Sequence, residues 1–175
     1  MDLEHLLVLV SGGDENAFNH LYTETSGKIY AIALLMLRQR EQAEEVVQET
    51  YLRIWQQSVT FSPEKGTPMA WMTTIARRLA IDRIRFLNRQ GKTDLALEEH
   101  VQTMALNVAQ DENDLSDQVW ICLRKLNSDR AKLILLAFYA GYTHEELAAN
   151  SEQPLGTVKS SIRRGLMSLK QCLGA

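Results

Sequence analysis

The sequence predicts an all-α protein made of two small helical domains, and three observations support this prediction. Only three of its 175 residues are proline, nine are glycine and 7% are aromatic, which disfavours a turn-rich β-sandwich. Apolar residues make up 45% of the chain, enough to bury a core in each domain. Apolar residues also recur at helical spacing on both sides of an acidic central stretch.

The distribution of charge divides the chain into three parts. The net charge is −1 over residues 1–90, −5 over residues 91–114 and +3 over residues 115–175. We therefore predict two domains, 1–90 and 115–175, joined by an acidic flexible linker at 91–114. Residues 77–92 and 155–170 are strongly basic, which indicates two modules that each contact a polyanion. The alternative is two solvated helix faces.

The first domain is predicted to contain four helices. Asp14 caps a short helix that ends near residue 22, and a second helix covers about 26–38. A third, at about 41–57, has an apolar stripe of Ala43, Val46, Val47, Tyr51, Ile54 and Trp55. After a loop with Pro63 and Gly66, Thr67 caps a helix that has Pro68 at its first position and ends at Gly91. Its inward residues are Met72, Ile75, Ala76, Leu79 and Phe86.

The second domain begins near Ser116 with an apolar stripe of Val119, Trp120, Leu123 and Leu126. Residues 127–129 interrupt it, and a buried helix covers 130–140 with Gly141 as its C-cap. Thr143 and Glu146 form a capping box, and a turn covers 150–154. The last helix is predicted to bury Leu155, Val158, Ile162, Leu166, Leu169 and Leu173.

Residues 143–170 have the layout of a helix-turn-helix, in which a short capped helix and a turn precede a longer basic helix. Arginine can donate two parallel hydrogen bonds to guanine, and Thr157 can present its hydroxyl and nearby backbone N–H groups to a phosphate. The alternative is a helical hairpin with a solvated basic face. The predicted exposed face consists of Lys159, Ser160, Arg163, Arg164 and Met167.

The helix after the loop has a second basic face. Trp71 near its start and Phe61 in the loop add aromatic surface, which either stacks on bases or packs in the core. A basic helix beside a loop that contains lysine is suited to bind single-stranded DNA and an unstacked base. The residues that share this side are Thr74, Arg78, Ile81, Arg85 and Arg89, with Arg77 beside them.

The helix at 41–57 is acidic on the face opposite its apolar stripe. Leu52 lies there among carboxylates and glutamines, which favours contact with a basic protein helix over contact with DNA. A solvated helix face would have a similar composition. The face comprises Glu41, Glu45, Gln48, Leu52 and Gln56, flanked by Glu44 and Glu49.

The acidic helix at 41–57, the loop and basic helix that follow it, and the helix-turn-helix at 143–170 occur in this order along the chain. Together they resemble the extracytoplasmic-function (ECF) group of the sigma-70 family. AEEVVQETYLRIW (43–55) resembles the family's polymerase-binding helix, and FSPEKGTPMAWMTTIARRLAIDRIR (61–85) its promoter-melting loop and −10-reading helix. YAGYTHEELAANSEQPLGTVKSSIRRGLMSLK (139–170) resembles its −35-reading helix-turn-helix. The loop is bracketed by Pro63 and Pro68, so its base preference does not follow from the resemblance.

The resemblance implies a role for each group of residues. Against the β′ clamp helices of core RNA polymerase it places Glu45, Gln48, Glu49 and Leu52. It implies that Lys65 and Thr67 help to capture a flipped −10 base, while Arg77, Arg78 and Arg85 hold the melted strand or the adjoining phosphates. On the −35 duplex it places Lys159, Ser160, Arg163 and Arg164, and to these we add Thr157 because of its position at the start of the helix. The implied partners are core RNA polymerase (β′ clamp helices and β flap), promoter DNA and an anti-sigma protein, often membrane-anchored. A helix-turn-helix regulator that acts without polymerase is the alternative.

Other classes of protein are disfavoured. The longest apolar runs, 29–37 and 133–142, are shorter than the about 20 residues of a membrane-spanning helix, and the N-terminus lacks a signal-peptide pattern. The four histidines are scattered, and no nucleophile, metal-ligand or phosphate-binding motif is present, so we expect no catalytic residue, metal, cofactor or small-molecule substrate. We expect a cytoplasmic protein. Cys122 and Cys172 are either a reversible disulfide pair or two thiols that are buried or have no particular role.

Overall fold

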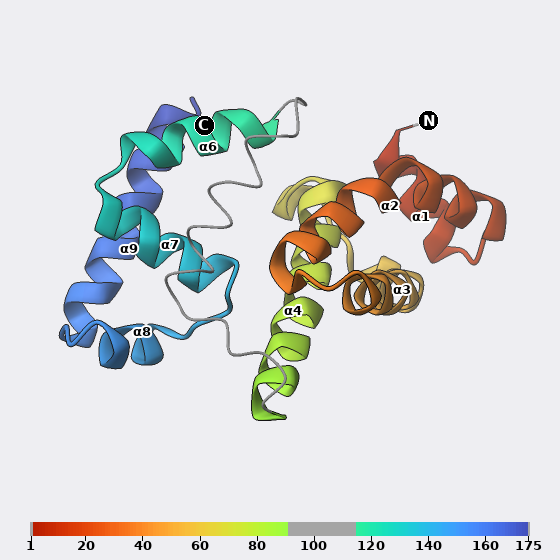
Figure 1. Ribbon diagram of the computed structural model, residues 1–175. Helices are drawn as coiled ribbons and strands as arrows, with labels where there is room; N and C mark the ends of the chain where they lie inside the picture. Colours follow the sequence, from red (N-terminus) through yellow and green to blue (C-terminus); the bar gives the residue numbers. More distant parts are fainter. Residues whose placement is uncertain (1, 91–114, 175) are drawn as a thin grey trace. The chain divides into compact units, whose positions relative to one another are not determined.

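The computed structural model describes residues 2–90 and 115–174, and within these ranges every regular element is a helix, which confirms the all-α prediction (Figure 1). The helices fall into two compact units. The first contains α1 (Leu3–Ser11), α2 (Glu15–Leu37), α3 (Arg40–Gln57), the 3₁₀ turns η1 (Ser58–Thr60) and η2 (Pro63–Lys65), and α4 (Pro68–Arg89). The second contains α6 (Leu115–Lys125), α7 (Ser128–Phe138), α8 (His144–Asn150) and α9 (Leu155–Cys172). Gly91 and the predicted linker at 91–114 lie outside the described residues.

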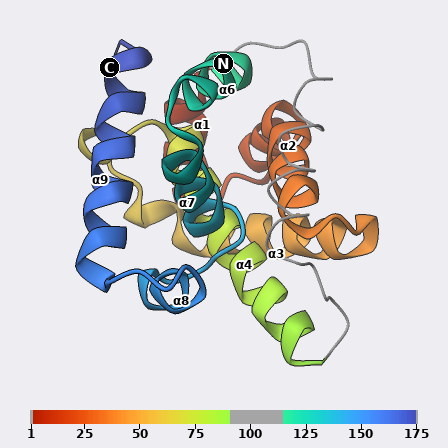
Figure 2. The same ribbon diagram turned by 60° about the vertical axis from the view of Figure 1, so that its left-hand side comes forward.

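The core of the first unit lies where α2, α3 and α4 pack against one another, with α1 against α2 (Figure 2). The predicted stripe of α3 is confirmed except at Trp55, which is half-buried against Phe18. One buried polar contact links α2 to α3: the hydroxyls of Thr25 and Tyr51 lie 2.6 Å apart. Burial raises the pKa of the Tyr51 hydroxyl, and the hydrogen bond to Thr25 opposes this rise without cancelling it.

The prediction of two helices between residues 14 and 38 is wrong, because α2 is continuous. Its N-cap is Asp14, as predicted, with the carboxylate accepting from the backbone N–H of Ala17 at 3.0 Å. Leu21, Thr25 and Ile29 are all buried, so one apolar stripe passes through the expected break. Gly27 is exposed there, and a glycine in a helix costs only about 1 kcal/mol, which this packing outweighs.

Helix α4 begins as predicted and departs from prediction at its other end. The Thr67 hydroxyl caps it, and Pro68 occupies its first turn. Met72 and Ala76 are buried, as expected. Phe86, predicted to face inward, is 42% exposed, and its neighbour Leu87 is buried in its place.

In the second unit, α8 lies at the N-terminal end of α9 and α6 lies near its C-terminal end (Figures 1 and 2). The predicted capping box is confirmed: Thr143 accepts from the backbone N–H of Glu146 at 3.1 Å, and Glu146 accepts from the N–H of Thr143 at 2.6 Å. The predicted interruption at 127–129 is shorter in the structure, because α7 already begins at Ser128, where the Asn127 side chain accepts from the N–H of Asp129. The core of this unit contains Leu133, Leu136, Ala140, Leu147, Val158 and Ile162.

The buried stripe of α9 differs from the prediction, since Leu155 and Leu173 at its two ends are only half-buried. Val158, Ile162 and Leu169 are buried, but Leu166 is 38% exposed and Gly165 is buried instead. A Cβ atom at Gly165 would lie 2.5 Å from Cδ1 of Ile134 on α7. The absence of a side chain at Gly165 therefore allows α7 and α9 to approach closely.

Candidate functional site

The acidic face of α3 contains the four residues predicted to contact polymerase. Gln48 and Leu52 are exposed, and half of the Leu52 surface is accessible. The Glu49 carboxylate accepts from Nε of Arg53 at 2.8 Å, one turn along the same helix. The Glu45 carboxylate instead accepts from Arg83 of α4. The face is exposed, as expected, and one of its acids is held by a neighbouring helix.

The loop between α3 and α4 presents Lys65 and Thr67. Lys65 ends η2, and Gly66 follows with φ +142°, a conformation that side chains disfavour. Thr67 is exposed, and its hydroxyl oxygen accepts from the N–H of Ala70 at 3.3 Å. Phe61 and Trp71 pack edge to face with ring centroids 5.8 Å apart, so the loop is fixed against the first turn of α4.

Three arginines of α4 were predicted to hold DNA. Arg78 and Arg85 are exposed, while Arg77 is half-buried. Arg89, in the last turn, extends the basic surface. Arg83 does not belong to this surface, because its guanidinium is bonded to α3. The position of Arg83 along the helix did not predict this contact with α3.

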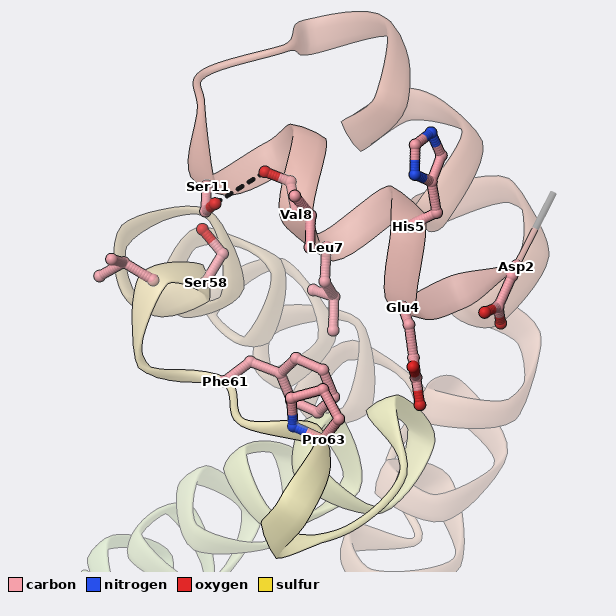
Figure 3. Close-up of a pocket in the computed structure, with 10 residues that line it drawn as sticks. Asp2, Glu4, His5, Leu7, Val8, Ser11, Ser58, Phe61 and Pro63 are labelled. Carbon is pink, nitrogen blue, oxygen red and sulfur yellow. Dashed lines mark hydrogen bonds between the residues drawn. The ribbon is translucent and has the colours of Figure 1, made fainter.

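A pocket of about 390 Å³ opens between α1 and residues 58–63 (Figure 3). Asp2 and Glu4 line it together with apolar side chains that include Leu7 and Phe61. Lys65 and Thr67 are not among its lining residues. Carboxylates repel phosphate groups, so the pocket is unsuited to the DNA backbone.

The exposed face of α9 carries the predicted basic residues, and the Arg163 side chain is exposed to solvent there. Arg164 folds back on its own helix, where its guanidinium donates to the hydroxyl and the carbonyl of Ser160 at 3.3 Å each. Lys159 lies 4.0 Å from the Glu145 carboxylate of α8. Met167 adds an apolar contact surface that is 62% exposed.

Thr157 differs in one respect from the prediction. Its hydroxyl side chain is exposed, near the first turn of α9. Its own backbone N–H, however, donates to the carbonyl of Pro154 at 2.8 Å, and that of Val158 donates to the same oxygen. These two N–H groups are therefore engaged within the helix, and a phosphate at this position would meet the hydroxyl.

The structure joins Cys122 of α6 to Cys172 of α9 in a disulfide, with Cα atoms 5.8 Å apart. Cys122 is buried and Cys172 is exposed. The bond fixes α6 to the C-terminal end of the basic helix. Within the described ranges, no helix is long and apolar enough to cross a membrane, and no group of side chains is arranged to hold a metal ion.

Comparison with known proteins gives matches in both units. Residues 21–90 match the model of sigma-70 region 2, and residues 116–169 match that of sigma-70 region 4. ECF RNA polymerase sigma factors named SigK, from Mycobacterium bovis and Mycobacterium tuberculosis, are 33% identical over 98% of this chain and 94% of their own length. A solved chain from an RsbN–BldN complex is 21% identical with a TM-score of 0.42, over 94% of this chain and 97% of its own. The family models and the SigK relatives show that this chain belongs to the sigma-70 family, among its ECF sigma factors.

Proposed function

We propose that this chain binds core RNA polymerase through the acidic face of α3 and directs it to promoters that it reads at two places. As an ECF sigma factor it is a transcription initiation factor, and we assign it no catalytic step. One observation carries the proposal: a single chain presents an acidic helix face with an exposed leucine and, on two other helices, exposed basic faces. These faces suit a protein partner and DNA, respectively.

In the proposed division of labour, residues 1–90 bind polymerase and the −10 element, residues 91–114 connect, and residues 115–175 bind the −35 element. The polymerase contacts are made with the β′ clamp helices. Leu52 supplies apolar area at the centre of this contact, and the surrounding polar groups supply the rim. The rim residues are Glu45, Gln48 and Glu49.

For the −10 element, we propose that Lys65 and Thr67 receive an unstacked base while the arginines of α4 hold the strand. The Phe61–Trp71 contact supports this assignment, because it fixes the loop that carries both residues against the arginine-bearing helix. Phosphate contacts of this kind do not depend on sequence, so base selection rests with the loop. The arginines are Arg77, Arg78 and Arg85.

For the −35 element, we propose that α9 enters the major groove. Arg163 is exposed and suited to a guanine edge, while Thr157 and Lys159 are placed for phosphates. Arg164 would have to leave Ser160 to reach DNA, and its two 3.3 Å hydrogen bonds are long, so little is lost on release. The same unit is proposed to contact the β flap.

Membership of the ECF group also supports a proposed anti-sigma partner. We propose that this partner is membrane-anchored and holds the chain inactive at the inner face of the membrane. The test is co-purification of the full chain from the membrane fraction of its natural host. The comparison uses membranes from a host that lacks every protein that co-purifies with the chain. If the chain is recovered from these membranes in the same amount as from unmodified membranes, the proposed anchoring is refuted.

The test of the main proposal is transcription from fragmented bacterial DNA by purified core polymerase, with and without this chain, with sequencing of transcript 5′ ends. New starts that share two upstream elements are expected. Arg163→Glu with Arg164→Glu should abolish these starts and spare polymerase binding, whereas Gln48→Ala with Leu52→Ala should weaken polymerase binding. Equal loss of polymerase binding in both variants would refute the division of labour. Tight DNA binding without polymerase binding would indicate a regulator that acts alone.

A further inference from the structure

Arg83 of α4 bonds two side chains of α3 at once. Its Nη2 donates to Oε2 of Glu45 at 2.5 Å, and its Nε donates to Oε1 of Gln42. The guanidinium also lies over the ring of Phe86, with Cζ 5.5 Å from the ring centroid. The two hydrogen bonds join residues 41 and 38 positions apart in sequence, so they depend on the packing of α3 against α4.

The geometry explains why an arginine occupies this position. Gln42 and Glu45 are three residues apart on a helix, so their side chains project from adjacent turns of one face. A guanidinium presents donors in a rigid fork that reaches both acceptors, whereas a lysine ammonium has a single charged atom. The Arg83 side chain is only 28% exposed, which limits screening by solvent.

The restraint acts on a residue of the polymerase-binding face. A free glutamate samples many rotamers, and a partner that binds it must order the side chain first. Glu45 is held by Arg83, yet 57% of its side chain remains exposed, so it is available to a partner in an ordered position. We propose that Arg83 is a positioning residue, which holds Glu45 ready for polymerase and does not contact DNA. This inference rests on the proposed function of the α3 face.

The experiment measures the affinity of the full chain for core polymerase without DNA. Arg83→Met keeps an apolar side chain over Phe86 and removes every donor, and we expect it to weaken binding about fivefold. Arg83→Lys keeps the positive charge but lacks the forked donors, so its affinity for polymerase should lie between those of the unchanged chain and Arg83→Met. Arg40→Met is the matched control, because Arg40 forms an exposed ion pair with Glu44 at 3.1 Å on the same helix. We expect it to leave the affinity unchanged.

The decisive comparison repeats Arg83→Met in a Glu45→Gln background, with the melting temperature recorded for each variant. If Arg83 acts through Glu45, Arg83→Met should weaken polymerase binding by less than about twofold in the Glu45→Gln background, because the two residues act as a unit. Equal losses of affinity in both backgrounds would overturn the inference and indicate a purely structural role. Unchanged polymerase affinity with impaired promoter opening would also overturn it, because Arg83 would then contact DNA. Intact binding after Gln48→Ala with Leu52→Ala would refute the proposed face itself.

Discussion

Gly165 is the point at which the basic helix α9 touches α7, and its replacement by alanine isolates one contact. The added Cβ would lie 2.5 Å from Cδ1 of Ile134, whereas ordinary contacts fall between 3.4 and 4 Å. The next neighbours, Cγ1 of Ile134 at 3.5 Å and Cβ of Arg130 at 3.7 Å, are at ordinary distances. The conflict is therefore confined to a single methyl group.

Two effects of Gly165→Ala oppose each other. Alanine is the better helix former by about 1 kcal/mol. Overpacking a core costs about 1–3 kcal/mol, and Ile134 is 4% exposed, so its methyl group has little room to rotate away. We expect overpacking to prevail by about 1 kcal/mol, taking the middle of these ranges. Ile134→Val removes the conflicting Cδ1 atom, and in that background Gly165→Ala should stabilise by about 1 kcal/mol.

The assay is native-state hydrogen exchange of α7 amides in the full chain, which reports the opening free energy of the second unit. All four members of the cycle are measured: the unchanged chain, each single variant and the double variant. A coupling energy of about 2 kcal/mol is expected, the difference between the two backgrounds. A coupling below about 0.5 kcal/mol would refute the reasoning, because Gly165→Ala would then act independently of the Ile134 methyl group.

Three further predictions concern other contacts. Reduction of the Cys122–Cys172 disulfide, whose cysteines are 50 residues apart, should destabilise the second unit by about 4 kcal/mol in the chain-entropy model. Thiol titration of the folded, mildly oxidised protein checks the bond, and two freely reactive thiols would contradict it. Thr143→Ala removes the N-cap of α8 and should cost about 1 kcal/mol, measured by exchange of α8 amides, with Thr143→Ser as the control that retains the hydroxyl. Because burial raises the pKa of Tyr51 above its ordinary value of 10.0, its contribution to stability is present below that pH and is lost as the pH rises through the folded pKa. Tyr51→Phe should abolish this alkaline loss in denaturation curves, and an unchanged pH dependence would assign the loss to another group.

Local chemistry predicted the starts of helices well. The N-caps at Asp14, Thr67 and Thr143 are found where the sequence placed them, because a cap depends on residues within three positions. Exposure of the basic face of α9 was also predicted from local sequence, because this face lies opposite an apolar stripe.

Errors arose where tertiary packing decides between neighbours. An α-helix has 3.6 residues per turn, so either of two adjacent residues can face the core at a given turn. In α9, contact with α7 places Gly165 there instead of Leu166. The same applies to Leu87 and Phe86 at the end of α4. Helix α1 was not predicted at all, and the role of Arg83 in the site emerged only from a contact between two helices.

The continuity of α2 has a consequence for insertions and deletions. Each residue of an α-helix turns the chain by about 100°, so one inserted residue near Gly27 would rotate everything beyond it relative to everything before it. Thr25 and Ile29 could then no longer both face the core. Two helices joined by a loop would absorb such a change in the loop. Related chains should therefore vary in residue type along residues 15–37 while keeping this length, and an epitope tag placed there should prevent the first unit from folding.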